Sequence, residues 1–235
     1  MVRVVVLGRF QPFHRGHAHL LEAALVVAGE DELMVAIGSS EAEATLRNPW
    51  SAPEREAMLR SWLAEVHPEA GERVRVCHVP DINDPPAWVA HATSFHGTGL
   101  LVTSDEPTAL LYEADGWSVH RVDLHGRSDW EGWRVRETAR MLSTVGDDEA
   151  VLTVLEPSVP SSVVRWLIAE DALYDSINSL SVDYDEVFKA LGSMPPQCFW
   201  WLSTPDLGVW LVDHIDEMRC DYISSTGQER HLHDI

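Results

Sequence analysis

Short apolar runs alternate with amphipathic stretches through residues 2–122, and this alternation restricts the fold more than any other feature of the chain. The first run, residues 2–7, is apolar throughout, as expected of a parallel strand that is buried on both faces. The pattern predicts strands over 2–7, 32–38, 74–79, 100–103 and 118–122, with helices over 17–28, 52–66, 87–94 and 108–113. Such alternation is typical of an α/β fold, a doubly wound parallel sheet with helices on both faces.

The pattern changes near residue 134. Helices are expected over 134–142 and 161–170, and residues 173–235 then differ in character from the rest. This last part holds a cluster of aromatic residues at 199–201, apolar residues at helical spacing over 207–218, and a polar end. We therefore expect a main domain over residues 1–172 and a helical C-terminal appendage over 173–235, packed on the main domain or on a partner subunit.

The charge balance is strongly acidic, with 17 Lys and Arg residues against 38 Asp and Glu residues and a net charge of −21. Such a chain repels nucleic acids and anionic membranes, so neither is expected as a partner, and an anionic ligand needs local cations and backbone amides. Lys189 is the only lysine. Acid excess with few lysines is typical of proteins from a high-salt cytoplasm; an ordinary acidic protein is the alternative.

The remaining composition favours a cytoplasmic location. No apolar run reaches the ~18 residues of a membrane span, and the apolar start of the chain is too short for a signal peptide. The 3 cysteines, Cys77, Cys198 and Cys220, are far apart and form no CxxC pair, so neither a disulfide framework nor a zinc ribbon is expected.

A candidate phosphate site lies where the first predicted strand ends and the first helix begins. The stretch GRFQPFHRGH spans residues 8–17. In a Rossmann-like sheet, ligands bind beyond the carboxyl ends of the strands, and the amides and dipole of a helix N-terminus attract anions. His14 and His17 are three residues apart, so both project to one side of the first helical turn and can donate to phosphate oxygens. Gly8 and Gly16 allow close approach of a ligand to the backbone.

This stretch resembles the signature of the nucleotidyltransferase superfamily with the HxGH motif, and it is most similar to the archaeal-type nicotinamide-nucleotide adenylyltransferases. Further blocks resemble that family in the same order. They are GSS at 38–40, RNPWSAPER at 47–55, PDIN at 80–83 followed by Trp88, and VPSSVV at 159–164. The resemblance covers residues 1–172 and implies the Rossmann-like fold of that superfamily.

The resemblance has departures in its C-terminal half. Trp133 stands where the phosphate motif of the family has a hydroxyl, and residues 143–158 contain an insertion. Ser104, Asp105 and Glu106 replace a Gly-Asn-Pro turn, which brings two acids near the expected nucleotide pocket. Arg136 aligns with the arginine of the phosphate motif, and Arg140 competes with it for that role.

The resemblance implies that the phosphate of nicotinamide mononucleotide attacks the α-phosphorus of ATP, with Mg²⁺ bridging the triphosphate, to give NAD and pyrophosphate. It also implies the site residues. The catalytic candidates are His14, His17, Arg47 and Arg136; the ATP-phosphate candidates are Gly8, Arg9, Phe10, Gln11, Gly16 and Arg140; the nicotinamide-nucleotide candidates are Ser39, Asp81 and Trp88. Trp88 is alternatively a core tryptophan, and Arg55 is either a phosphate ligand or an exposed charge on a helix flank.

Two other functions stay open. One is an HxGH nucleotidyltransferase with another phosphorylated acceptor, of the pantetheine-phosphate, flavin or cytidylyl type. The other is a nucleotide-binding regulator that has lost turnover, with the tryptophan-rich appendage as its partner surface. The resemblance further implies a homo-oligomer.

Overall fold

The structure, a computed structural model, describes residues 3–82, 84–123, 130–173, 221–223 and 229–231 of the 235-residue chain. Five parallel strands form one sheet in the order β3-β2-β1-β4-β5. The strands are β1 (Val4–Gly8), β2 (Leu33–Ile37), β3 (Val74–His78), β4 (Leu100–Thr103) and β5 (Ser118–Arg121). The helices are α1 (Arg15–Ala28), α2 (Ala52–Val66), α3 (Trp88–His96), α4 (Glu106–Ala114), α5 (Gly132–Leu142), α6 (Asp148–Leu155) and α7 (Ser161–Ala169).

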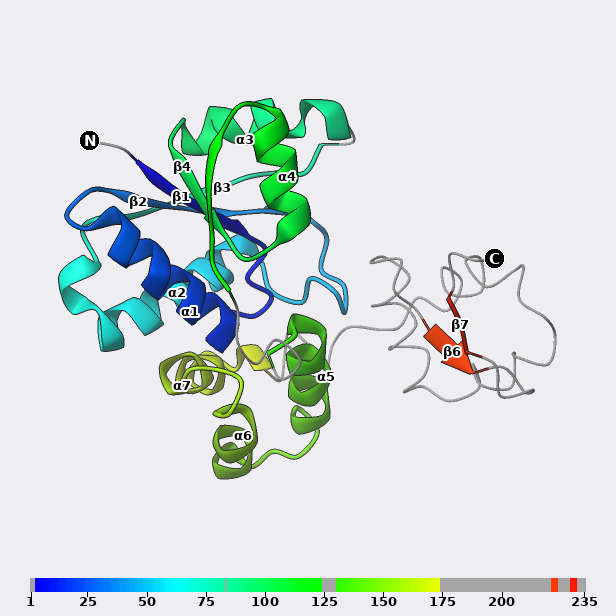
Figure 1. The fold of residues 1–235 in the computed structure, drawn as a ribbon. Coiled ribbons are helices and arrows are strands. Elements are labelled where there is room, and N and C mark those ends of the chain that lie inside the picture. Colours follow the sequence, from blue (N-terminus) through cyan, green and yellow to red (C-terminus); the bar gives the residue numbers. More distant parts are fainter. Residues whose placement is uncertain (1–2, 83, 124–129, 174–220, 224–228, 232–235) are drawn as a thin grey trace.

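The sheet lies between two helical layers. Helices α1 and α2 cover one face and α3 and α4 cover the other, while α5 to α7 gather beside the first layer, with α7 packed on α2 (Figure 1). From β1 the chain moves outward to β2 and β3, and it then returns to β4 on the other side of β1. The carboxyl end of β1 is therefore the switch point of the sheet, where the loops diverge and leave room for a ligand.

The α/β class, the Rossmann-like parallel sheet and the strand and helix order through residue 122 are confirmed, with element ends shifted by a few residues. Helix α1 begins at Arg15, two residues before the expected start, because the side chain of His14 caps it. The insertion at 143–158 contains a further helix, α6, that the sequence pattern did not predict.

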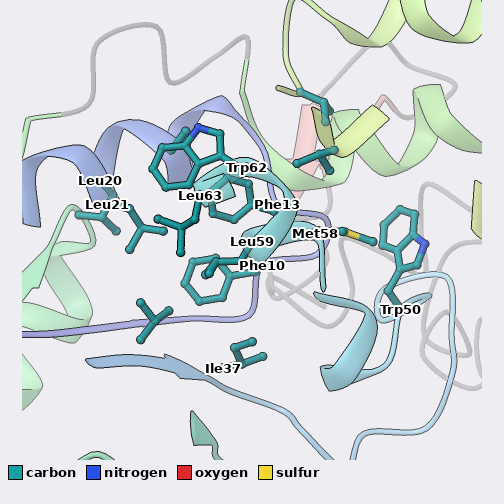
Figure 2. Packing of buried hydrophobic residues seen from close by; sticks show 14 of the residues in the cluster. Phe10, Phe13, Leu20, Leu21, Ile37, Trp50, Met58, Leu59, Trp62 and Leu63 are labelled. Carbon is teal, nitrogen blue, oxygen red and sulfur yellow. The ribbon is translucent and has the colours of Figure 1, made fainter. Parts of the chain in front are cut away.

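The core between the sheet and the first helical layer is built from α1, α2 and the loop after β1. Figure 2 shows the aromatic rings of Phe10 and Phe13 packed among aliphatic side chains from these elements. Helix α2 contributes an apolar stripe, which includes Met58 and Trp62. Its start is fixed by a capping box, in which the backbone N–H of Ser51 donates to Glu54 Oε2 at 2.7 Å.

The packed region continues to residue 173. Ala172 and Leu173 are buried, and the indole Nε1 of Trp50 donates to the backbone oxygen of Ala172 at 3.3 Å. Beyond this point the structure describes a two-stranded antiparallel pair, β6 (Asp221–Ile223) and β7 (Glu229–His231). The aromatic cluster at 199–201 and the helix expected over 207–218 lie outside the described residues. Among the helices that are described, none has the length and apolar character needed to cross a membrane.

Candidate active site

The loop after β1 folds back on itself beside the strand. Phe10 has a left-handed backbone (φ 54°) and its ring is buried against Gly8. A Cβ atom at Gly8 would lie 3.0 Å from Phe10 Cζ, closer than real Cβ atoms normally approach. Gly8 is therefore required by the ring of Phe10, whereas the sequence suggested the close approach of a ligand as the reason for this glycine.

His14 and His17 cap the start of α1 reciprocally. The backbone N–H of Gly16 donates to His14 Nδ1 at 3.1 Å, and the backbone N–H of His14 donates to His17 Nδ1 at 3.3 Å. The two rings stack with their centroids 3.7 Å apart. Because both Nδ1 atoms accept hydrogen bonds, the neutral rings carry their protons on Nε2. The ring of His17 also forms a hydrogen bond with the backbone of Pro12, so a ligand at His17 would share or replace this contact.

Both imidazoles are held in the neutral form. Burial lowers the pKa of His14 to about 3, and the positive charge of Arg136 adds to this effect. Burial and the neighbouring His14 likewise lower the pKa of His17 well below its ordinary value. At neutral pH the pair therefore offers N–H donors rather than fixed positive charges.

The low pKa of His14 predicts a loss of stability in mild acid. The unfolded chain binds a proton at this residue below about pH 6.5, whereas the folded chain resists it until about pH 3. The wild-type free energy of unfolding should therefore fall about 2 kcal/mol more between pH 7 and pH 5 than that of a His14→Asn variant. Asparagine is the matched control because it still caps a helix without titrating. Urea denaturation at both pH values measures the difference, and parallel curves would contradict the neutral His14.

An open pocket of about 260 Å³ lies between this loop and the N-terminus of α5. Its lining comprises Arg9, Phe10, Gln11, His14, Gly16, His17, Leu20, Ser104, Trp130, Glu131, Gly132, Trp133 and Arg136. Arg136 is 5% exposed, and its Nη1 donates to the backbone oxygen of Gln11 at 3.0 Å. Two arginines and two imidazole donors thus converge on one cavity at the switch point of the sheet, which suits a phosphorylated ligand.

The structure brings seven of the predicted site residues together in this lining: Arg9, Phe10, Gln11, His14, Gly16, His17 and Arg136. It separates the two competing arginines of α5, because Arg136 lines the pocket and Arg140, one turn further along, does not. Arg47 is half-buried in the loop between β2 and α2 and is not part of the lining.

Gln11 has a further task besides lining the pocket. Its Nε2 donates to the backbone oxygen of Trp50 at 2.6 Å, and its Oε1 accepts from the backbone N–H of Trp50 at 3.2 Å. This pair of hydrogen bonds ties the loop after β1 to the segment that enters α2, so the amide of Gln11 holds the pocket wall.

The three nicotinamide-nucleotide candidates lie at the carboxyl ends of the neighbouring strands. Ser39 follows β2 with a left-handed backbone (φ 49°), and Asp81 is exposed in the loop after β3. Trp88 begins α3, where it is half-buried and packs against the core on that face of the sheet. All three are on the same edge of the sheet as the pocket, although none of them lines it.

The acids at 105 and 106, which the sequence places near the nucleotide pocket, follow the lining residue Ser104 but are not themselves part of the lining. Asp105 caps α4, with its Oδ2 accepting from the backbone N–H of Thr108 at 2.9 Å. Glu106 forms an ion pair with Arg121 at 2.8 Å. The two carboxylates therefore cap α4 and pair with an arginine of β5. Of these three residues, only Ser104 lines the pocket.

Sequence reasoning missed the acid and the aromatic residue that precede α5. Trp130 and Glu131 line the pocket, and Glu131 Oε2 accepts from the indole N–H of Trp133 at 2.8 Å. The indole of Trp133 is therefore directed to this carboxylate. Gly132 was the one signal in the sequence that this segment approaches another backbone closely. The structure shows the reason for the glycine, since a Cβ at this position would lie 3.3 Å from the backbone oxygen of Gln11.

Comparison with known proteins identifies the family. The cytidylyltransferase-like family matches residues 5–226 of the chain, so the match extends past the boundary expected at residue 172. The nicotinamide-nucleotide adenylyltransferase of Archaeoglobus fulgidus is 31% identical over 175 residues, which cover 73% of this chain and 94% of that protein. The nicotinamide-nucleotide adenylyltransferase of Pyrococcus horikoshii is 36% identical over 171 residues, covering 71% and 83%.

Among solved structures, a bifunctional NMN adenylyltransferase/ADP ribose pyrophosphatase from Francisella tularensis, complexed with AMP and a manganese ion, has a similar fold. The TM-score is 0.57 at 18% identity, and the alignment covers 87% of this chain but 57% of that one. The fold, the pocket at its switch point and the sequence relatives agree, and the chain belongs to the cytidylyltransferase-like family and, within it, to the nicotinamide-nucleotide adenylyltransferases.

Proposed function

We propose that this nucleotidyltransferase transfers the adenylyl group of ATP to the phosphate of nicotinamide mononucleotide. The observation that supports this most directly is the stacked pair His14 and His17, whose Nε2 protons are free of the capping hydrogen bonds and adjoin a pocket that Arg9 and Arg136 also line. The relatives named above carry this activity in their names.

The reaction needs no nucleophile from the protein. A phosphate oxygen of the mononucleotide bonds to the α-phosphorus of ATP, the bond from that phosphorus to the oxygen bridging to the β-phosphorus breaks, and pyrophosphate leaves with that electron pair. Catalysis then consists of alignment and stabilisation of the developing charge. In our proposal His17 donates from Nε2 to the α-phosphate, His14 donates beside it, and Arg9 and Arg136 neutralise the phosphates.

Mg²⁺ fits this site as part of the substrate. Within the described residues no cluster of three or more His, Cys, Asp or Glu side chains could hold a metal ion, and Glu131 is the one carboxylate in the pocket lining. A cation that keeps several waters and is bound mainly by phosphate oxygens needs few protein ligands. We expect Mg²⁺ to enter with ATP and to offset the charge of the leaving pyrophosphate.

We place the mononucleotide beyond the ends of β2 and β3, next to the triphosphate. Ser39 and Asp81 supply polar groups on this side, Trp88 supplies an aromatic face, and Arg47 lies in the loop that follows Ser39. A cationic nicotinamide ring stacked on Trp88 would gain about 0.5–2 kcal/mol.

A Trp88→Ala variant should raise the KM for nicotinamide mononucleotide about 3- to 30-fold and change the KM for ATP much less, because only the first substrate stacks on the ring. Trp88→Phe is the control for packing, since it keeps an aromatic face and most of the apolar contact with the buried clusters around Leu101 and Val79. Steady-state kinetics with each substrate varied in turn measures both constants. Equal effects on both substrates, or a variant that fails to fold, would favour a purely structural tryptophan.

A panel of donors and acceptors tests the function as a whole. We expect rapid product formation with ATP and nicotinamide mononucleotide, and little with CTP or with pantetheine phosphate or riboflavin phosphate as acceptor. A preference for one of those acceptors would move the chain to another branch of the superfamily. Binding of ATP and NAD by calorimetry without turnover would support the regulator instead.

Assembly and location remain predictions from the resemblance and the charge. We expect a homo-oligomer in the cytoplasm that binds neither nucleic acid nor membrane, in keeping with the net charge of −21. Sedimentation of the full chain measures the oligomeric state, and a monomer at micromolar concentration would contradict that part.

A further inference from the structure

Arg55 of α2 is a buried cation that joins the loops at the carboxyl ends of β1 and β2. Arg55 is 1% exposed. It therefore cannot be an exposed charge on the flank of the helix or a phosphate ligand, the two roles that the sequence suggested. Nη1 donates to the backbone oxygens of Arg9 at 2.6 Å and of Gly38 at 2.8 Å. Nη2 donates to the backbone oxygen of Ser39 at 3.0 Å, and Nε donates to that of Ser51 at 3.2 Å.

These hydrogen bonds flank the two left-handed residues of the site. Phe10 (φ 54°) directly follows Arg9, whose backbone oxygen accepts from Arg55. At Ser39 (φ 49°), Arg55 donates to the backbone oxygen of Ser39 itself and to that of the preceding residue, Gly38. A left-handed backbone is strained at a residue with a side chain, and it persists only where its surroundings hold it. One guanidinium holds both turns, and the backbone N–H of Gly38 also donates to the oxygen of Gly8 at 3.0 Å.

The charge of Arg55 is retained in this buried position. Burial and the charge of Arg9 lower the pKa of Arg55 to about 10, while Asp81 and Glu54 act in the opposite direction. The group is therefore cationic at neutral pH, and a cation without water needs its carbonyl partners. The planar, forked guanidinium can donate to both loops at once, whereas a lysine ammonium is a single point of charge.

We propose that Arg55 is a positioning residue, which fixes the distance between the triphosphate site after β1 and the mononucleotide site after β2. This inference rests on the proposed function, because it assigns Arg9 to ATP and Ser39 to the mononucleotide. Arg55 touches neither substrate. It sets how the two loops sit relative to each other, and so whether the attacking phosphate meets the α-phosphorus in line.

Such a role has a binding signature that a general loss of stability lacks. ATP and the mononucleotide each bind on one side of the site. If one loop shifts relative to the other, each substrate can shift with its own loop and keep its affinity. NAD, the product, spans both sides, so its affinity depends on their separation. Turnover depends on the same separation, and a misplacement of about 1 Å can cost about 10²-fold in rate.

The test compares Arg55→Lys with Arg60→Lys, a control on the same helix that removes hydrogen bonds to the Val74 oxygen and to Glu56, away from the site. Calorimetry on the full chain should show the Kd for NAD raised at least about 10-fold in Arg55→Lys, the Kd values for ATP and the mononucleotide raised less than about 3-fold, and kcat lowered about 10²-fold. Arg60→Lys should leave all four values close to those of the wild type. Equal weakening of the three ligands, or no change, would overturn the positioning role.

If Arg55→Lys does not fold, the same comparison is made in a Ser39→Gly background. Glycine adopts the left-handed turn without strain, so the double variant loses less stability than the single one. The selective loss of NAD affinity should persist relative to Ser39→Gly alone, and its absence would overturn the inference. Failure of the wild type itself to bind the mononucleotide or NAD would instead overturn the proposed function, and the positioning role with it.

Discussion

An Arg136→Met variant should lose about 10²- to 10³-fold in kcat, the scale for removing one group that stabilises developing charge in a transition state. Arg136 is 5% exposed, lines the pocket and donates to the loop after β1, and its charge lowers the pKa of His14. The loss therefore combines a missing phosphate contact with a less well-ordered loop. Steady-state kinetics with both substrates saturating measures it.

Arg140→Met is the matched control for Arg136. Both arginines project from α5, one helical turn apart, but only Arg136 lines the pocket. Arg140→Met should keep kcat within about 3-fold of wild type, because this half-buried arginine lies outside the pocket lining. Arg136→Lys keeps the positive charge and is the control for a variant that fails to fold. Its kcat should still fall at least about 10-fold, because an ammonium lacks the forked donors of a guanidinium. A larger loss at Arg140 than at Arg136 would reverse our assignment.

A His17→Ala variant should lower kcat by about 10²-fold or more through loss of the Nε2 donor to the α-phosphate. The binary affinity for ATP should change less than kcat, because the interaction strengthens as charge develops. His19→Ala on the same helix is the control, since His19 lines a different hollow with Glu22 and Trp62. Rapid-quench kinetics separates chemistry from product release. A His17→Ala enzyme with wild-type chemistry would remove this residue from the mechanism.

The part of the site that is continuous in sequence could be predicted. The stretch from Arg9 to His17 supplies six of the predicted lining residues because a strand, a tight loop and a helix start place them together without help from the rest of the chain. The parallel sheet could be predicted for a similar reason. Each strand and each crossover helix has its own hydrophobic period, which can be recognised in the sequence of that element alone.

The part of the site that depends on tertiary packing could not be predicted. Two arginines of α5 fit the spacing equally well, and only the packing of that helix on the loop after β1 selects Arg136. The burial of Arg55 likewise could not be predicted from its sequence context, APEREAMLR, which is charged and typical of an exposed helix. Asp105 and Glu106 looked like pocket acids because the cap of α4 and the partner at Arg121 become apparent only in the fold.

Adenylyl transfer to nicotinamide mononucleotide at the pocket of His14, His17 and Arg136 can be followed with labelled ATP. One reaction uses ATP labelled at the α-phosphate, and a parallel reaction uses ATP labelled at the γ-phosphate. We predict that α-label appears in NAD and γ-label in pyrophosphate, in equal molar amounts, and that both products fall together in His17→Ala. Release of α-label as AMP without a dinucleotide would contradict adenylyl transfer to the mononucleotide, and label in NAD from His17→Ala at the wild-type rate would contradict the role of His17.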